Sequence, residues 1–489
     1  MVAKQVSPDL SDVSLLLGSL VPQDNFYRRL KQRLDLTFLY VAVAPYYGQC
    51  GHQSIDPIVF FKLLLVGHLE NLCSDRAIIR TSQLRLDILY FLDYSVGQPL
   101  PWHSTLSRTR QRLPPVVFDA CFQHILSACV EAGMVAGDTQ AIDSAFVQAW
   151  ASMDTLKAID LAEWSVEKNL MPLPEQALGQ PTPLLATVNA NKLRRNNRTH
   201  RSSTDGEARL AQKPGKAFRL YYLSSMAVDT ASHVITHIQA DLADEKDSRH
   251  LMDLVGKIAH TLKGQGLPLQ AVLADSGFSS GENYAALEQK GIVGYVSISG
   301  VYKPDRGLFT YQPDQDAYVC TQGKELPCVG LRMEKGYPIY YYYSKTSDCG
   351  PCPVKAACCG KRRYKQLAVT AFRHYYQRVQ ARLNSPQGQR MKKRRSSTVE
   401  PVFGSLLNYF GMRRVNTRGR EAAHKIMLLA ATAYNLKKYL AFPVGPKTKV
   451  KALNQSSQEC LYFCVQLKLR LWEIFLEPFS VVQHPRVVW

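Results

Sequence analysis

Three acidic residues that lie far apart in the chain are the first candidates for chemistry. Asp143 sits among apolar and small residues, and Asp275 directly follows the apolar run Val272–Ala274. Glu400 is the single acidic residue in the stretch 361–420, which contains sixteen Lys or Arg residues. A carboxylate without a partner is costly to bury. One that lies inside so basic a stretch indicates a metal ligand next to a phosphate backbone.

Carboxylates in this setting predict metal-assisted phosphoryl transfer. Two divalent ions about 4 Å apart can activate the attacking oxygen and stabilise the leaving oxygen. Hard oxygen ligands suit Mg²⁺ or Mn²⁺. We therefore predict that Asp143, Asp275 and Glu400 are catalytic residues that bind these ions. Taken singly, each aspartate can equally be a turn or cap residue, and the spacing along the chain decides nothing.

The basic residues of the same region predict a nucleic-acid partner. The chain of 489 residues carries a formal net charge of +20, which favours nucleic acid or an anionic membrane surface. A charge run is often only a solvated face, but predicted helices flank this one. The best candidates for contact with a DNA backbone are Lys392, Lys393, Arg394, Arg395, Arg413 and Arg414.

A cluster of cysteines predicts a structural zinc site. Six of the twelve cysteines fall between positions 320 and 359, which is typical of metal binding in a reducing compartment. Cys349, Cys352 and Cys358 have the spacing of a zinc knuckle, and Cys320 or Cys328 can supply the fourth thiolate. We prefer Cys320, because the residues around it resemble the opposite turn of a ribbon. The alternative is a group of reduced cysteines without a metal.

No membrane partner is predicted. The chain has no run of eighteen apolar residues. Its first residues also lack the basic and apolar regions of a secretory signal. We therefore expect a cytoplasmic protein, in agreement with the cysteine usage.

Residues 1–135 are predicted to form an all-helical accessory or DNA-binding domain. Asp56-Pro57 begins a helix whose apolar residues recur at helical spacing. Ser104 is the predicted N-cap of an arginine-bearing helix, and a further helix at 116–132 ends before a glycine. Several short helices that include a basic one resemble DNA-binding helical modules. The alternative is a plain helical cap or a dimerisation domain.

Residues 136–440 are predicted to form a mixed α/β domain. A strand at 141–149 is followed by a hairpin of strands at 221–228 and 233–238, and then by alternating helices and strands. Asp143 thus lies within the first strand, and Asp275 lies at the carboxyl end of a later strand, where α/β proteins place ligands.

Several other segments complete the predicted organisation. Near the carboxyl end of the mixed domain, helices are expected from about residue 372, at 399–409 and at 421–440. Residues 154–218 are polar and lack periodicity, which predicts a loop-rich insertion. Residues 300–370 form a Cys-rich insertion that resembles a zinc ribbon. Residues 441–489 are a tail without an assigned role.

The sequence resembles the DDE transposases of bacterial insertion sequences over roughly residues 24–440. Each matching piece alone is weak, and the combination is specific. The pieces are residues 51–79 (GHQSIDPIVFFKLLLVGHLENLCSDRAII), Trp102–Arg108, Ala141–Asp143, residues 273–283 (LADSGFSSGEN), residues 399–404 (VEPVFG), Arg413-Arg414 and Ala433–Leu436. The resemblance implies an RNase H-like mixed sheet flanked by helices, with an all-α N-terminal domain.

The resemblance also implies a function. In this family the first and second Asp and the Glu bind the metal pair, which implies Asp143, Asp275 and Glu400 for this chain. The expected protein is a DNA transposase that binds the ends of an insertion sequence, exposes a 3′-hydroxyl and joins it to target DNA. Its partner would be double-stranded DNA, as transposon ends and as target. Synapsis of two ends implies a homodimer at the nucleoid of a bacterial cytoplasm.

The chain departs from the family pattern near the catalytic residues. Ser144-Ala145 stand where the family often has Gly-Thr, and Leu407 stands where a Lys commonly follows the Glu. Lys393 and Ser396 replace a Tyr and an Arg that usually precede the Glu, although the two arginines between them can still contact phosphate. Two alternatives therefore stay open: a catalytically decayed, transposase-derived DNA-binding protein, and a sequence-nonspecific nuclease of the same fold.

Overall fold

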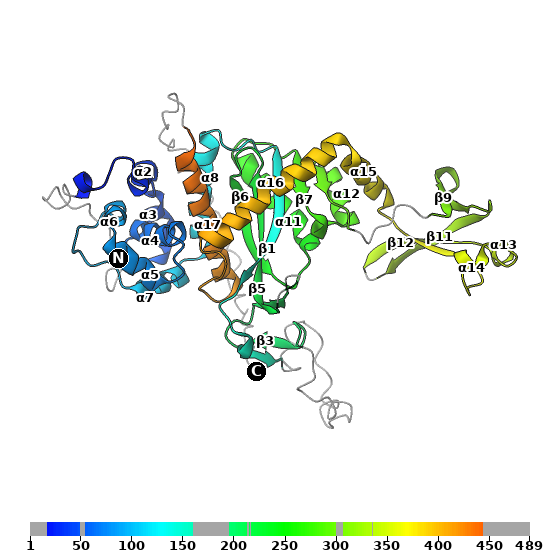
Figure 1. Cartoon of the computed structure of the whole chain (residues 1–489), viewed down its shortest axis with the longest axis horizontal. Helices are drawn as coiled ribbons and strands as arrows, with labels where there is room; N and C mark the ends of the chain where they lie inside the picture. Colours follow the sequence, from blue (N-terminus) through cyan, green and yellow to red (C-terminus); the bar gives the residue numbers. More distant parts are fainter. Residues whose placement is uncertain are drawn as a thin grey trace, which may run out of the picture.

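Three parts of the chain follow one another along its longest axis. In the computed structural model, the described residues are 17–48, 54–159, 195–212, 215, 217–299, 307–334 and 336–443. Figure 1 shows N-terminal helices on one side, a central sheet covered by helices, and a ribbon of strands that projects from the opposite side. Almost all of the predicted tail 441–489, and much of the predicted insertion 154–218, lies outside the described residues.

The N-terminal part consists of helices, as predicted. They are α2 (Phe26–Arg33), α3 (Phe38–Val43), η1 (Ala44–Tyr46), α4 (Pro57–Leu69), α5 (Asp75–Leu84), α6 (Leu86–Leu92), α7 (His103–Arg112) and α8 (Pro115–Glu131). The carboxylate of Asp56 caps α4 by accepting from the N–H groups of Ile58 and Val59. The predicted cap at Ser104 is wrong, because α7 begins one residue earlier and Trp102 precedes it. No described helix is long and apolar enough to cross a membrane by itself; α7 and α8 reach that length only as a pair bent by 96°.

The central sheet is mixed. Its strands are β1 (Thr139–Gln148), β4 (Arg209–Ala211), β5 (Arg219–Asp229), β6 (Ile235–Leu242), β7 (Ala271–Ala274) and β8 (Val293–Val296). β5 pairs antiparallel with β1, β4 and β6, whereas β7 runs parallel to β1 and β8 runs parallel to β7. The order β6-β5-β1-β7-β8 with a single reversed strand is that of an RNase H-like sheet. The predicted fold class is confirmed.

Five helices cover the sheet or connect its strands. They are α11 (Asp247–Gly264), α12 (Gly281–Gln289), α15 (Arg373–Asn384), α16 (Pro386–Tyr409) and α17 (Arg420–Ala441). α16 crosses the sheet and packs on β1, β5, β7 and β8 through a buried face that includes Val399, Val402 and Leu406 (Figure 1). The predicted helix 399–409 is too short, because the hydroxyl of Ser385 caps a helix that begins at Pro386. The basic run and Glu400 consequently lie on one continuous helix.

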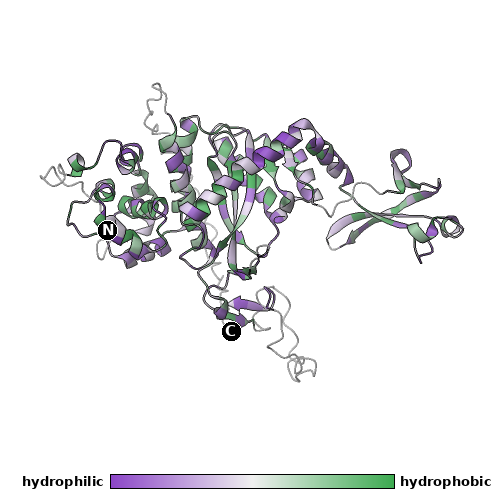
Figure 2. Ribbon diagram, viewed as in Figure 1, coloured by the Kyte–Doolittle hydropathy of each residue, from purple (hydrophilic) through white to green (hydrophobic). Residues whose placement is uncertain are grey.

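One hydrophobic core joins the N-terminal helices to the sheet. α17 makes this connection, because it packs on α4 and α8 and also on β6. Figure 2 shows apolar residues concentrated in the central strands and in the helices beside them. The predicted boundary at residue 135 thus marks a change from helices to strands, while the core continues across it. The division into domains stays a prediction.

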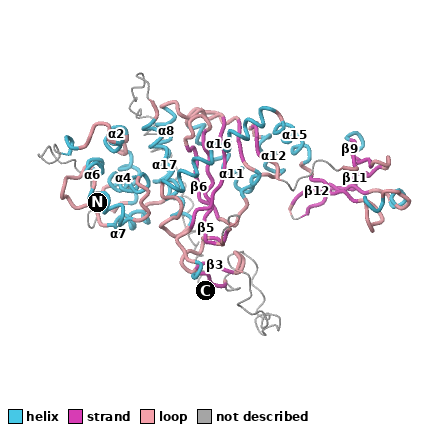
Figure 3. Tube along the Cα trace, viewed as in Figure 1, coloured by secondary structure: helices cyan, strands magenta, loops and turns pink. Residues whose placement is uncertain are grey.

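The Cys-rich insertion forms a separate antiparallel sheet (Figure 3). Its elements are β9 (Phe309–Gln312), η6 (Pro313–Gln315), β10 (Ala317–Cys320), β11 (Glu325–Glu334), β12 (Tyr337–Tyr343), α13 (Thr346–Cys349), α14 (Lys355–Cys358) and β13 (Gln366–Thr370). Its own small core consists of Phe309, Tyr318, Leu326, Tyr342, Leu367 and Val369. The described ends of the 154–218 insertion hold η2 (Met153–Thr155) and the paired strands β2 (Leu156–Ala158) and β3 (His200–Ser202).

Asn435 on α17 pairs with the open edge of β6. Its Oδ1 accepts from the N–H of Ile235 at 2.9 Å, and its Nδ2 donates to the carbonyl of the same residue at 2.8 Å. The side chain is fully buried. Asn435 therefore satisfies two backbone groups of an edge strand that no neighbouring strand pairs.

We predict that Asn435→Ala lowers the free energy of unfolding by about 2–4 kcal/mol, because it leaves both Ile235 groups buried and unpaired. Chemical denaturation followed by circular dichroism measures the change. The matched control is the exposed Asn408 on α16, where Asn408→Ala should change stability by less than about 0.5 kcal/mol. Equal losses in the two variants would contradict this role of Asn435.

Candidate active site

Asp143 lies within β1, and Asp275 directly follows β7, the parallel strand that pairs with β1. Ala141 of β1 pairs with Leu273 of β7, and each aspartate follows two residues later in its strand direction. Neighbouring strands are about 4.8 Å apart, so equal register brings the two side chains to the same level. β7 ends at Ala274, and Asp275 then turns the chain into η5 (Ser276–Phe278), where its carboxylate accepts from the N–H of Gly277 at 2.9 Å. The sheet thus brings together two of the three predicted catalytic residues.

The carboxyl group of Asp143 is largely removed from solvent. Its side chain is 20% exposed, and burial raises its pKa to about 6. The nearby charge of Asp275 raises this pKa further, while the N–H of Ser144 and the guanidinium of Arg395 oppose the shift. Asp143 therefore resists ionisation more than a surface carboxylate does, and a cation beside it would lower its pKa again.

Glu400 approaches this pair through a bridging arginine. Nη1 of Arg395 donates to Oδ2 of Asp143 at 3.0 Å, and Nη2 lies 3.5 Å from Oε1 of Glu400. Arg395 lies five residues before Glu400 on α16 and is only 16% exposed, whereas Glu400 is 62% exposed. α16 thus places Glu400 at the edge of the site, with the guanidinium of Arg395 between the two carboxylates.

Sequence reasoning missed a fourth acidic residue, Asp247, the first residue of α11. Burial raises the pKa of Asp247, a hydrogen bond with Ser144 opposes the shift, and the charge of Asp275 adds to it. Asp247 is separated from Asp143 by 104 positions and belongs to a helix that periodicity alone predicts. No local pattern therefore signalled its place beside Asp275.

The chemistry of these side chains fits divalent cations with oxygen ligands. Asp247 and Asp275 form no ion pair with a Lys or Arg of the described chain. Gly277 leaves space between them, since a Cβ atom there would lie 2.8 Å from Oδ2 of Asp247 and 3.1 Å from Oδ1 of Asp275. Over the described residues, no three His, Cys, Asp or Glu side chains are arranged around one metal position. Arg395 supplies the positive charge on the Glu400 side instead.

The predicted DNA-binding residues fall into two groups with different environments. Lys392, Lys393 and Arg394 are exposed on α16, in the turns before Glu400. Arg413 and Arg414 are exposed in the segment after α16, which pairs with the end of β1 at Gln148. Arg414 also stacks on Trp150, with its guanidinium carbon 4.3 Å from the ring centroid. Arg395 differs from all of these, because its guanidinium is turned inward to the carboxylates.

The four predicted zinc ligands line one pocket of the Cys-rich insertion. Cys320, Cys349, Cys352 and Cys358 surround it, and Cys359 joins them. Burial raises the pKa of the Cys359 thiol to about 12, and hydrogen bonds with Cys358 and Cys349 add to the effect. Cys328 lies outside this pocket and interacts with Asp316. Cys320 thus lies with the other three predicted ligands and Cys328 does not, and the choice of Cys320 as a zinc ligand stays a prediction; sequence spacing did not indicate the place of Cys359.

The raised pKa of Asp143 makes a prediction about stability. Between its ordinary value of 3.8 and about 6, the folded protein keeps a proton that the unfolded chain has released, so stability falls as pH rises through this window. Asp143→Asn removes the loss, and at pH 7.5 the variant should be more stable by about 1–3 kcal/mol. At pH 4 the difference should vanish. Thermal unfolding at both pH values measures it, with the exposed Asp253→Asn as control; a less stable Asp143→Asn protein at pH 7.5 would contradict the assignment.

Two segments of the chain match families that are described as transposase domains. Residues 16–112 match the family described as Transposase domain (DUF772), and residues 319–440 match the family described as Transposase DDE domain. No curated protein matches the chain. A cryo-EM structure of a piggyBac transposase synaptic complex with hairpin DNA is similar over 88% of this chain and 77% of that chain, at 10% identity and a TM-score of 0.31. Both matched segments are thus similar to transposase domains, and they contain the N-terminal helices and the helix that carries Glu400.

Proposed function

We propose that the chain is a DNA transposase that binds the ends of an insertion sequence and catalyses cleavage and strand transfer with Mg²⁺ or Mn²⁺. Its DDE domain belongs to a family of phosphoryl-transfer enzymes. The observation that carries the proposal is the equal register of Asp143 and Asp275 on β1 and β7, with Glu400 tied to Asp143 through Arg395. These residues come from three distant parts of the sequence, and a purely structural role does not require them to meet.

The proposed roles follow from the positions of the side chains. Asp143 and Asp275 would hold the cations, and Glu400 would complete the site when Arg395 turns away. Bound Mg²⁺ supplies activation of the attacking oxygen and stabilisation of the leaving oxygen. Since the pKa of Asp143 is about 6, this residue is largely ionised at neutral pH and available as a ligand.

DNA would lie along the exposed basic face of α16. Lys392, Lys393 and Arg394 precede Glu400 on this helix and offer positive charge to a phosphate backbone next to the carboxylates. Arg413 and Arg414 extend the basic surface beyond the helix. Transposition joins two ends to one target, so we expect a homodimer on double-stranded DNA in the cytoplasm, at the bacterial nucleoid.

A second candidate is a transposase-derived DNA-binding protein without catalysis. Leu407 replaces a Lys of the family pattern; its hydrocarbon side chain carries no charge for DNA and packs against the hydrophobic core. Arg395 also occupies the space between Asp143 and Glu400. These two observations favour the second candidate, whereas the shared register of the aspartates favours the enzyme.

We predict that the purified protein nicks and joins a duplex that carries the DNA flanking its coding sequence, when Mg²⁺ or Mn²⁺ is present. Asp275→Ala and Glu400→Gln should each lower the rate by roughly a hundredfold or more, because the metal contributes several kcal/mol to the transition state. Gel electrophoresis of end-labelled DNA measures nicking and joined products.

The matched control is Glu282→Gln, an exposed acidic residue on α12, which should leave the rate unchanged. Binding of the duplex without cleavage by the wild type would support the decayed DNA-binding protein. Cleavage of any DNA without joined products would support a nonspecific nuclease. Equal rates for the wild type and Asp275→Ala would overturn the assignment of the catalytic residues.

We also propose that the cysteine pocket binds a structural Zn²⁺. Thiols from β10, α13 and α14 line this pocket, and the insertion has only a small hydrophobic core of its own. Small units of this kind are often stabilised by a metal. Four thiolates leave no position for a substrate, so the ion would stabilise the fold of the insertion and take no part in catalysis.

We predict about one zinc ion per chain, measured by elemental analysis of the purified protein. Cys352→Ser should lose the zinc, because Cys352 lines the pocket. Cys328→Ser should keep it, because Cys328 lies outside the pocket. Zinc-free wild-type protein, or equal zinc contents in the two variants, would contradict the proposal.

A further inference from the structure

An open groove lies at the carboxyl-terminal end of α17. Its volume of about 570 Å³ falls within the range of about 300–1,000 Å³ that is usual for binding pockets. The last turns of α17 and of α16 line it, and the turn between β5 and β6 contributes Ser232. The groove therefore adjoins the same helix that carries Glu400.

Aromatic side chains make up much of the lining. Phe410 and Tyr434 are buried, with their ring centroids 5.7 Å apart. Tyr409 is 67% exposed, and Phe442 is half-buried. Apolar surface that is exposed in a concave site is typical of a place where another apolar segment binds.

Two lysines give the groove a positive charge. Nζ of Lys437 lies 5.7 Å from the ring centroid of Phe410, and Nζ of Lys438 lies 5.8 Å from that of Tyr434. Among the described residues, neither lysine forms an ion pair. Burial also lowers the pKa of Lys438. An occupant that carries carboxylates next to apolar side chains would match both the rings and the lysines.

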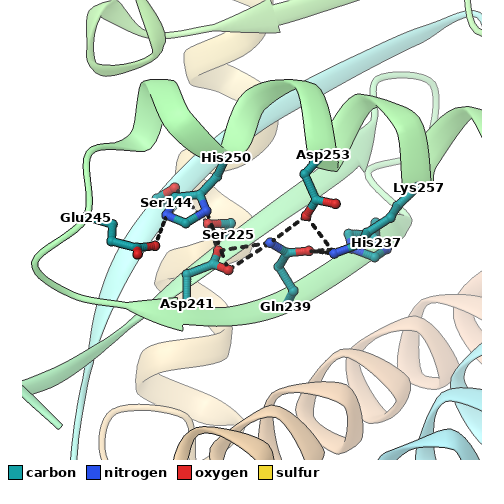
Figure 4. Close-up of polar contacts among 9 residues, drawn as sticks. All are labelled: Ser144, Ser225, His237, Gln239, Asp241, Glu245, His250, Asp253 and Lys257. Carbon is teal, nitrogen blue, oxygen red and sulfur yellow. Dashed lines mark hydrogen bonds and ion pairs between the residues drawn. The ribbon is translucent and has the colours of Figure 1, made fainter. Parts of the chain in front are cut away.

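The polar contacts between α11 and β6 differ from the groove, because their side chains already have partners. Lys257 of α11 donates to Gln239 of β6 at 2.8 Å, and Nδ1 of His250 lies 3.7 Å from Asp241. Figure 4 shows these contacts between the helix and the strand. They need no further occupant, whereas the groove leaves aromatic and basic side chains exposed to solvent.

The tail of the chain contains a segment with the required chemistry. Residues 471–479 (LWEIFLEPF) are apolar or aromatic apart from Glu473 and Glu477, and they lie outside the described residues. Pro443, the last described residue, lines the groove itself. The chain therefore continues from the groove into the tail. Residues 444–470 can span up to about 90 Å when extended, so their length allows the segment to return.

We propose that residues 471–479 bind in the groove of their own chain. Their apolar side chains would cover the exposed aromatic surface, and their two glutamates would lie near Lys437 and Lys438. The bound segment would hold the end of α16 against α17. Tethering favours this occupant over a separate molecule, because a linked segment is present at a high effective concentration. The proposal does not depend on the proposed catalytic activity.

Photo-crosslinking in the full-length protein tests the proposal. Trp472→p-benzoylphenylalanine should, on irradiation, form a crosslink to peptides that contain residues 405–410 or 434–443, which mass spectrometry identifies. The matched control is Asn454→p-benzoylphenylalanine, which is closer to the groove along the chain but lies in a polar part of the tail. Its yield should be lower by at least about tenfold, because tethering alone does not place a side chain in the groove.

Exchange of the charges tests the contact with the lysines. Lys437→Glu/Lys438→Glu should lower the yield of the Trp472 crosslink by roughly threefold or more, and addition of Glu473→Lys/Glu477→Lys should restore it. The matched control is Lys263→Glu/Lys290→Glu, at two exposed lysines outside the groove, which should leave the yield unchanged. If the double variant at the groove fails to fold, the exposed Lys437→Glu alone replaces it.

Three results would overturn the proposal. The first is equal crosslinking from positions 472 and 454, and the second is a Trp472 crosslink that reaches only residues outside the groove. The third is a crosslink that joins two chains, seen as a dimer on a denaturing gel, because the segment would then come from a second copy. Each of these results leaves the proposed catalytic residues unaffected.

Discussion

Carboxylates that share a site repel one another, so this site depends on the positive charge that offsets the repulsion. Arg395 provides it on one side, where it bonds with Asp143 and lies within ion-pair distance of Glu400. Among the described residues, Asp275 and Asp247 form no ion pair with Lys or Arg. A guanidinium and a divalent cation can satisfy the same oxygens, but they differ in charge and in the geometry they require.

The acidic residues of the site lie either inside a strand or helix or directly at the end of one. Asp143 and Glu400 lie inside a strand and a helix, whereas Asp275 and Asp247 lie where a strand ends and a helix begins. The parallel register of β1 and β7 fixes the positions of Asp143 and Asp275, and the crossing of α16 over the sheet fixes the position of Glu400. Rigid elements place side chains more accurately than loops do, which phosphoryl transfer requires. α17 supports the central sheet from the other side, where Asn435 satisfies the edge of β6.

The Cys-rich insertion does not interrupt the central sheet, because the chain leaves the sheet and returns close to the same place. β8 precedes the insertion and α15 follows it, and α15 packs on both β8 and α12. The insertion has its own sheet and its own small core, so its folding need not change the positions of the acidic residues in the central sheet. It is nevertheless part of the segment 319–440 that matches the DDE domain, together with Glu400.

Local sequence patterns were sufficient for much of the fold. Asp56-Pro57 marked the start of α4, strand-like runs and a hairpin signal marked β1, β5 and β6, and the order of strands and helices indicated a mixed sheet. Local signals were misread at Ser104, since α7 already begins at His103, and a start signal was overlooked at Ser385-Pro386 before α16. Such signals act over a few residues, so they predict elements better than they predict exact ends.

The sequence alone therefore determined the elements, the strand positions of Asp143 and Asp275 and the grouping of the cysteines. Only the tertiary structure decided that Arg395 turns inward to a residue 252 positions away, and that Asp247 borders Asp275. The same holds for Cys359, which joins the pocket that Cys328 does not reach. The reason is physical: periodicity reflects neighbours along a helix or strand, whereas these contacts depend on how distant elements pack together.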